Sequence, residues 1–146
     1  MHRLLSSLVA ISCTLALASA ARAHCEVPCG IYDDDLRYKL LQEHAGTIEK
    51  SMQQIVDLSK QKNPNYNQIV RWTTNKDEHA DEVQHLVSQY FMTQRIKPED
   101  KNYEKKITTL HQMLIAAMKC KQTTDVENVK KLRELTKSFG DLYFAK

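Results

Sequence analysis

Glycine and proline are scarce in this chain of 146 residues, which contains only three of each. Folds built from many β-turns need both residue types, so the scarcity disfavours a turn-rich β fold. No stretch alternates between apolar and polar residues as a half-buried strand does, and no internal repeat stands out. We therefore predict an all-α protein.

The chain also lacks a strong charge of one sign and a second long apolar run. Its formal net charge is +3, and its basic residues form no dense stripe of the kind that contacts nucleic acid. Beyond the apolar residues 4–20, no run is long enough to span a bilayer. We expect no nucleic-acid partner, and no membrane partner once residues 1–23 are removed.

The four cysteines are too unevenly placed to form the framework of a disulfide-stapled secreted domain. Cys13 lies in the N-terminal apolar run, and Cys120 stands alone near the end of the chain. We expect Cys120 to be a partly buried small apolar residue on a helix. Cys25 and Cys29 lie close together in the sequence and form a separate pair.

Residues 1–23 have the features of a signal peptide. Arg3 lies near the start, the apolar run follows, and Ala21-Arg22-Ala23 is a cleavage signal. Removing these 23 of 146 residues leaves 123, enough for one domain with one core. The charge of +3 falls to about +1, because Arg3 and Arg22 are lost.

We therefore expect an exported protein, periplasmic or secreted. One alternative is a cytoplasmic protein whose pro-peptide is removed by a dedicated protease. A lipoprotein-type site at Cys13 would instead leave His24 inside the chain, without a free α-amine.

Cleavage after Ala23 would make His24 the first residue, with both its α-amine and its imidazole available as metal donors. Cys25 adds a backbone amide nitrogen and a thiolate, and Cys29 adds a second thiolate. Amine, amide and two thiolates can form a planar N2S2 set, with the imidazole above the plane. Tetragonal geometry of this kind suits Ni(II) or Cu(II) better than Zn(II), which prefers a tetrahedron.

The segment from His24 to Tyr32, HCEVPCGIY, resembles the start of the mature chain in the nickel superoxide dismutase family. That family begins with His-Cys-x-x-Pro-Cys-Gly-x-Tyr, and all six fixed positions are present here. The resemblance implies an oxidoreductase that disproportionates superoxide to dioxygen and hydrogen peroxide at one nickel ion per subunit, cycling between Ni(II) and Ni(III). It implies His24, Cys25 and Cys29 as the metal ligands, and a homohexamer of four-helix bundles as the assembly.

We call residues 24–32 the hook. Pro28 has no backbone N–H and a fixed φ, which restricts the hook, and Gly30 allows the chain to turn sharply after Cys29. By resemblance, Tyr32 has a catalytic role near the open metal face, where it shapes access for superoxide or water. Alternatively, its ring packs the hook onto the helical body.

One departure from the family concerns the Glu and Arg that commonly hold the axial imidazole. On an ungapped alignment the Glu position falls on Leu40 and the Arg position on His79, with Glu43 or Glu78 as substitutes for the missing Glu. His79 is therefore a candidate partner of the metal-bound histidine. The alternative is a core or interface histidine. We expect His44 and His111 to be core or groove residues, because both lie near apolar stripes.

Two segments after the hook have apolar residues at helical spacing. The first starts at the acidic residues 33–35, whose charge suits a helix N-terminus, and should end near Lys62. The break Asn63-Pro64-Asn65 separates it from the second, which should end before Pro98.

Two more helices are predicted nearer the C-terminus. The third carries apolar residues from Tyr103 to Met118. The fourth should start at Thr124, with Glu127 completing a capping box, and should fray or stop at Gly140. We thus predict an antiparallel four-helix bundle over residues 33–146, with the hook outside it as an irregular N-terminal arm.

Two other functions remain open from the sequence. An exported carrier could bind nickel or copper with the same donors and catalyse nothing. A helical protein without catalytic activity could instead join Cys25 to Cys29 in a disulfide. The combination of His24 at the cleavage point with Pro28, Gly30 and Tyr32 favours the dismutase.

Overall fold

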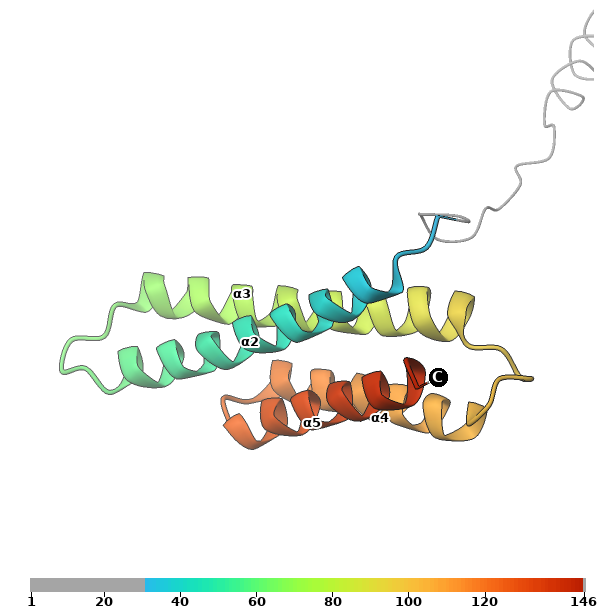
Figure 1. The fold of residues 1–146 in the computed structure, drawn as a ribbon. Coiled ribbons are helices and arrows are strands. Elements are labelled where there is room, and N and C mark those ends of the chain that lie inside the picture. The colour runs from blue at the N-terminus through green and yellow to red at the C-terminus, as the bar shows by residue number, and fades with distance from the viewer. Residues whose placement is uncertain (1–30, 146) are drawn as a thin grey trace, which may run out of the picture.

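The computed structural model describes residues 31–145, so hook residues 24–30 and the predicted signal peptide lie outside the described residues. The described chain is all-helical and contains no strand, which confirms the predicted fold class. Its helices are α2 (Asp34–Ser59), α3 (Tyr66–His85), α4 (Tyr103–Gln122) and α5 (Val126–Tyr143), shown in Figure 1. A π-helical segment, η1 (Leu86–Arg95), continues α3 without a break.

The helices pack side by side around one apolar core. Helix α2 contacts α3 and α5, and α4 contacts α3 and α5. The α2–α3 connection lies at one end of the molecule and the connection from η1 to α4 at the other (Figure 1). The largest fully buried side chains come from every element, including Phe91, Phe139, Leu41, Ile48, Met52, Leu110, Met113, Leu132 and Val83.

Carboxylate and amide side chains start three of the helices. The Asp33 carboxylate accepts the backbone N–H of Leu36 at 3.0 Å, which confirms that the acidic run starts α2. Asn65 caps α3 in the same way. The predicted capping box at Thr124 is wrong. Asp125 is the N-cap of α5, and its carboxylate accepts the backbone N–H of Glu127 at 3.0 Å.

Helix α5 does not stop at Gly140, contrary to the sequence prediction, and continues to Tyr143. A Cβ on Gly140 would lie 2.5 Å from the Tyr38 ring of α2. The glycine is therefore needed for close approach of α2 and α5 and does not end the helix. The first helix is also shorter than predicted, ending at Ser59 and not near Lys62.

The segment η1 differs from an α-helix in its hydrogen bonds. The backbone N–H of Ile96 donates to the carbonyl oxygen of Phe91, five residues earlier, at 3.0 Å. The Thr93 hydroxyl donates to the carbonyl of Ser88, also five residues earlier, at 2.7 Å. Such wide turns often occur at functional sites.

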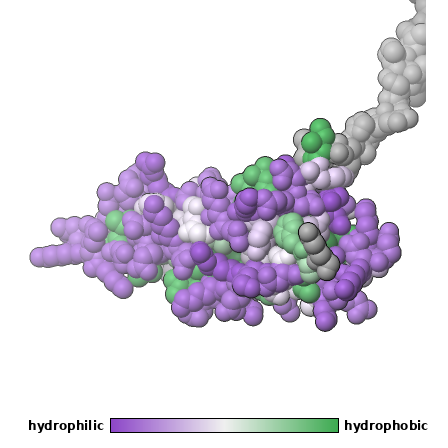
Figure 2. All heavy atoms as spheres, in the orientation of Figure 1, coloured by the Kyte–Doolittle hydropathy of each residue, from purple (hydrophilic) through white to green (hydrophobic). Residues whose placement is uncertain are grey.

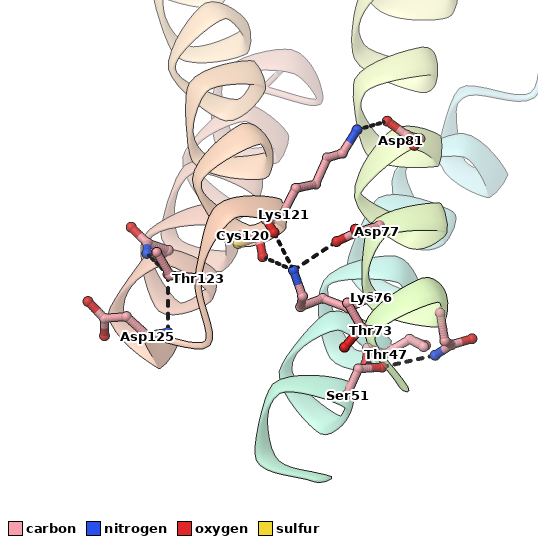
Figure 3. Close-up of polar contacts among 12 residues, drawn as sticks. Thr47, Ser51, Thr73, Lys76, Asp77, Asp81, Cys120, Lys121, Thr123 and Asp125 are labelled. Atoms are coloured by element: carbon pink, nitrogen blue, oxygen red, sulfur yellow. Dashed lines mark hydrogen bonds and ion pairs between the residues drawn. The ribbon is translucent and has the colours of Figure 1, made fainter. Parts of the chain in front are cut away.

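Lys76 is buried between α3 and α4 (Figure 3). Its Nζ donates to the carbonyl oxygens of Cys120 at 2.6 Å and Lys121 at 2.7 Å, and pairs with Asp77 at 2.8 Å. These carbonyls belong to the last turn of α4, which carries partial negative charge. Lys76 therefore caps α4 from the neighbouring helix.

The surroundings of Cys120 and His111 can be compared with the sequence predictions. Cys120 is fully buried on α4, which agrees with the predicted small apolar role. His111 is exposed, so the predicted core or groove position is wrong for it, because its side of α4 faces away from the packed helices.

Within residues 31–145, none of the helices combines the length and apolar character that crossing a bilayer requires.

Candidate metal centre and its surroundings

Tyr32, the last residue of the hook, is the point where the hook meets the helices. Its ring makes an edge-to-face contact with Tyr90 of η1, with the centroids 6.0 Å apart. The guanidinium carbon of Arg95 lies 4.3 Å from the Tyr32 ring centroid, a cation–π contact. The ring therefore packs against η1, as one of the two predicted roles requires, and remains 40% exposed.

Beside Tyr32, the Asp34 carboxylate collects hydrogen bonds from three side chains. Arg95 donates to it through Nε and Nη2, both at 2.8 Å. The hydroxyl groups of Tyr90 and Tyr143 donate to it at 2.7 and 2.8 Å. We call these four residues the Asp34 cluster, and it joins the start of α2 to η1 and to the end of α5.

The Asp34 cluster shifts the pKa values of its members. Burial alone would raise the pKa of Asp34, but the hydrogen bonds from Arg95, Tyr90 and Tyr143 outweigh it and lower the pKa. Burial and the Asp34 carboxylate raise the pKa of Tyr90 to about 12. The same two causes raise the pKa of Tyr143. The carboxylate is thus ionised and the phenols are protonated at neutral pH.

A groove of about 220 Å³ lies next to this cluster, between α2 and the α3–η1 rod. Its lining includes Leu40, the position where the family's Glu was expected, and Arg37, whose guanidinium lies over the Tyr90 ring at 5.4 Å. Nε of Arg37 is buried and has no hydrogen-bond partner among residues 31–145. The groove therefore holds a cation, with Glu82 also in its lining, near the start of α2, where the hook ends.

His79 lies half-buried on α3 and contacts His44 of α2. Their Nδ1 atoms are 2.8 Å apart and their ring centroids 5.0 Å apart. His44 also lines the groove. Burial lowers the pKa of His44, and His79 lowers it further, whereas Glu82 and Glu43 oppose the shift. The structure thus places His79 between two helices with a second imidazole as its partner.

Sequence reasoning identified Tyr32 and His79 but did not find the Asp34 cluster. It assigned the acidic run 33–35 a role at the helix N-terminus, which fits Asp33 and is incomplete for Asp34. Asp34 and Arg95 are 61 positions apart, and no spacing rule within one helix connects them. The sequence did not mark Arg95 as a site residue, because a single basic residue at the end of an apolar helical segment is common.

Apolar side chains are exposed around the start of α2. Figure 2 shows a mostly hydrophilic surface with several hydrophobic areas, one of them where the described chain begins. Ile31 and Leu36 contribute to the exposed apolar surface there, at 77% and 46% exposure. The hook therefore joins the helical body through an apolar region beside a charged cluster.

The predicted metal ligands His24, Cys25 and Cys29, and the hook-shaping residues Pro28 and Gly30, lie outside the described residues. Within residues 31–145, no group of three or more His, Cys, Asp or Glu side chains is placed to hold a metal ion. The fit to nickel therefore depends on the donor chemistry of the hook. Two thiolates with amine and amide nitrogens suit a tetragonal nickel site.

Comparison with known families gave one match. Residues 19–146 match the family described as nickel-containing superoxide dismutase. The match covers the hook and all of the described helices. No curated protein and no solved structure matches the chain.

Proposed function

Because the chain belongs to the nickel-containing superoxide dismutase family, and so disproportionates superoxide with a nickel cofactor, we propose that its hook holds the nickel. The observation that carries this proposal is the donor set behind the predicted cleavage site. His24 would supply an amine and an imidazole, Cys25 an amide nitrogen and a thiolate, and Cys29 a thiolate. A set of two thiolates with nitrogen donors would fit nickel.

When bound, nickel would supply one-electron cycling between Ni(II) and Ni(III), so that one superoxide gives up an electron and leaves as dioxygen, and a second takes up an electron with two protons and leaves as hydrogen peroxide. The side chains and backbone of the hook set the potential of that cycle. Thiolate and deprotonated amide are electron-rich donors that favour the higher oxidation state, so ligand identity is the means by which Cys25 and Cys29 tune the site. Pro28 would restrict the hook through its fixed φ, and Gly30 would allow the sharp turn after Cys29, so that these donors can converge.

We propose that Tyr32 has two roles, packing and access. Its contacts with Tyr90 and Arg95 support the packing role, since they place the ring against η1. Its 40% exposure leaves part of the ring facing solvent, as a residue that shapes access for superoxide or water requires. Arg37 in the neighbouring groove adds a positive charge, which would attract the superoxide anion.

We propose that His79 acts on the metal centre together with His44 and not alone. The contact at 2.8 Å supports this, because the orientation of one imidazole fixes the orientation of the other. His44 and Leu40 line the same groove. Leu40 occupies the position at which the family commonly has a Glu. Replacing His79 by Ala should slow turnover with nickel still bound, and unchanged kinetics would remove His79 from the site.

We further propose an antiparallel four-helix bundle that assembles as a homohexamer and is exported. The alternating ends of the helix connections in Figure 1 support the antiparallel order. Exposed apolar residues, including Ile31 and Leu36 near the hook, support assembly because subunit contacts would cover them. Light scattering of the native protein measures the assembly, and fractionation of its host measures the compartment.

The decisive experiment measures intact mass, nickel content and superoxide removal on protein purified from its own host. The proposal predicts a chain that starts at His24, carries one nickel per subunit and removes superoxide. Cys25→Ser and Cys29→Ser should lose nickel and keep their helical circular dichroism, whereas Cys120→Ala, a matched control, should keep both. Nickel without turnover would favour a carrier. A metal-free chain lacking two hydrogens would indicate a Cys25–Cys29 disulfide.

A further inference from the structure

We propose that Asp34 is a positioning residue for the hook, because it fixes the two side chains that hold the ring of Tyr32. The proposal rests on the proposed function, since it takes residues 24–32 to be the nickel-binding segment. Asp34 lies two residues after Tyr32, at the first position of α2. Within residues 31–145 its carboxylate accepts from Arg95, Tyr90 and Tyr143, and we argue its effect on the metal through these neighbours.

The hydrogen bonds of Asp34 are not needed to start the helix. Asp33 already serves as the N-cap and accepts from Leu36 N–H at 3.0 Å. Both carboxylate oxygens of Asp34 instead accept from side chains on other elements, Oδ1 from Tyr90 and Arg95 and Oδ2 from Arg95 and Tyr143. An acidic residue that only favoured the helix dipole would remain in solvent, as Asp35 does.

Arg95 connects Asp34 to Tyr32 through two parts of one rigid group. The edge of its guanidinium makes the bidentate pair with the carboxylate, at 2.8 Å for each bond. The guanidinium carbon stacks over the Tyr32 ring at 4.3 Å. Because the guanidinium is planar, holding its edge also fixes its face. The pair is only 19% and 28% exposed, so solvent competes weakly for it.

Tyr90 provides a second connection between the same two residues. Its hydroxyl donates to Asp34 at 2.7 Å, and its ring packs edge-to-face against Tyr32 at 6.0 Å. Both ring contacts of Tyr32 therefore depend on side chains bonded to one carboxylate. The hydroxyl of Tyr143 donates to the same carboxylate, so α5 also helps to hold Asp34 in place.

This arrangement would hold the last residue of the hook in place before nickel binds. A segment anchored at one end has less conformational freedom to lose when it closes around a metal. Supporting residues of this kind commonly change metal affinity about 10-fold to 100-fold when they are replaced. Loss of the Asp34 carboxylate should therefore weaken nickel binding about 10-fold, near the low end, because Asp34 acts through an intermediate residue.

The test measures nickel affinity by chelator competition on the chain that starts at His24. Asp34→Asn keeps the size of the side chain and removes its charge, and it should bind nickel about 10-fold more weakly with unchanged helical circular dichroism. Asp35→Asn is the matched control, because the Asp35 carboxylate is exposed and, within residues 31–145, forms an ion pair with Lys39 of its own helix. Asp35→Asn should keep wild-type affinity.

A double-mutant cycle distinguishes positioning from general destabilisation. Asp34→Asn combined with Tyr32→Leu should weaken nickel binding no more than Tyr32→Leu alone, because the effect of Asp34 passes through that ring. Fully additive losses would overturn the proposal, as would wild-type affinity in folded Asp34→Asn. The Ni(III) electron paramagnetic resonance spectrum is a second readout, and Asp34→Asn should broaden it because the hook is less well ordered.

Arg95→Lys keeps the test valid if Asp34→Asn fails to fold. Lysine retains the charge but loses the bidentate fork and the flat face that stacks on Tyr32. Arg95→Lys should weaken nickel binding to a similar extent, and wild-type affinity would overturn the proposal. A wild-type chain starting at His24 that binds no nickel would instead overturn the proposed function, so the two failures are distinguishable.

Discussion

The Nδ1 atoms of His44 and His79 lie 2.8 Å apart, and this contact joins α2 to α3 in the middle of both helices. At that distance one nitrogen donates and the other accepts, so the pair holds one proton between the two atoms. Protonating both rings would set two N–H donors against each other. The contact is therefore stable only while at least one imidazole is neutral.

The first prediction concerns pH. Burial and His79 lower the pKa of His44 below its ordinary value of 6.5, with Glu82 and Glu43 opposing. The unfolded chain therefore takes up this proton at a higher pH than the folded chain does. The contribution of His44 is fully present above pH 6.5 and is lost as the pH falls below that value. Urea unfolding at two pH values, one on each side of 6.5, measures the loss.

The variant His44→Gln isolates this contribution, because Gln does not titrate. The free energy of unfolding of His44→Gln should fall less than that of the wild type over the same pH interval. His111→Gln is the control, since His111 is exposed on α4, and it should follow the wild type. Equal pH dependence in His44→Gln and the wild type would contradict the prediction.

The second prediction contrasts two helical glycines. A Cβ on Gly140 would lie 2.5 Å from the Tyr38 ring, so Gly140→Ala should destabilise the fold by about 1–3 kcal/mol through overpacking. A Cβ on Gly46 would lie 3.7 Å from Arg133, an ordinary contact. Gly46→Ala should therefore stabilise the fold by about 0.5–1 kcal/mol through helix propensity. Thermal unfolding of both variants should give shifts of opposite sign, and shifts of one sign would contradict the structure.

The third prediction concerns Lys76 (Figure 3). Lys76→Met keeps most of the side-chain volume but leaves the carbonyls of Cys120 and Lys121 without their cation. Buried acceptors that lose their donor cost about 1–3 kcal/mol in the free energy of unfolding. Lys121→Met, the control, removes only a partly exposed pair with Asp81 and should cost less than about 1 kcal/mol. Equal losses in the free energy of unfolding for Lys76→Met and Lys121→Met, measured in urea, would contradict the capping role of Lys76.

The fourth prediction concerns the Cys120 thiol. Burial raises its pKa to about 11, although Lys76 lowers it in part. At pH 8 roughly one thiol in a thousand is then ionised, and it is also fully buried. In a chain carrying Cys25→Ser and Cys29→Ser, Cys120 should react with an alkylating reagent only after denaturation. Modification of the native protein at the rate of a free thiol would count against this position.

Local patterns in the sequence predicted the helices well. The core residues Leu41, Ile48, Met52 and Ile55 of α2 follow one another at spacings of seven, four and three, which a single helix face produces. The cap at Asp33 and the break at Asn63-Pro64-Asn65 are likewise local. These features depend on neighbouring residues only, so the sequence was enough to infer them.

Contacts between helices were not predictable in the same way. His44 and His79 are separated by 35 positions, and Asp34 and Arg95 by 61, so their pairing depends on how the helices align. The role of Gly140 was equally unpredictable from its sequence neighbours, because it depends on contact with Tyr38 of α2. The predicted ligands follow from a contiguous motif, and they remain predictions because residues 24–30 lie outside the described part of the chain.

The π-helical segment η1 has a consequence for insertions and deletions. Each residue of an α-helix turns the chain by about 100°, so a wide turn with one additional residue rotates everything after it by that angle. Arg95 comes at the end of η1, where this rotation is complete. Deleting one residue from η1 would restore an ordinary helix and turn the guanidinium away from Tyr32. A change in chain length far from the hook in sequence would thus disturb the hook without altering any residue that contacts it.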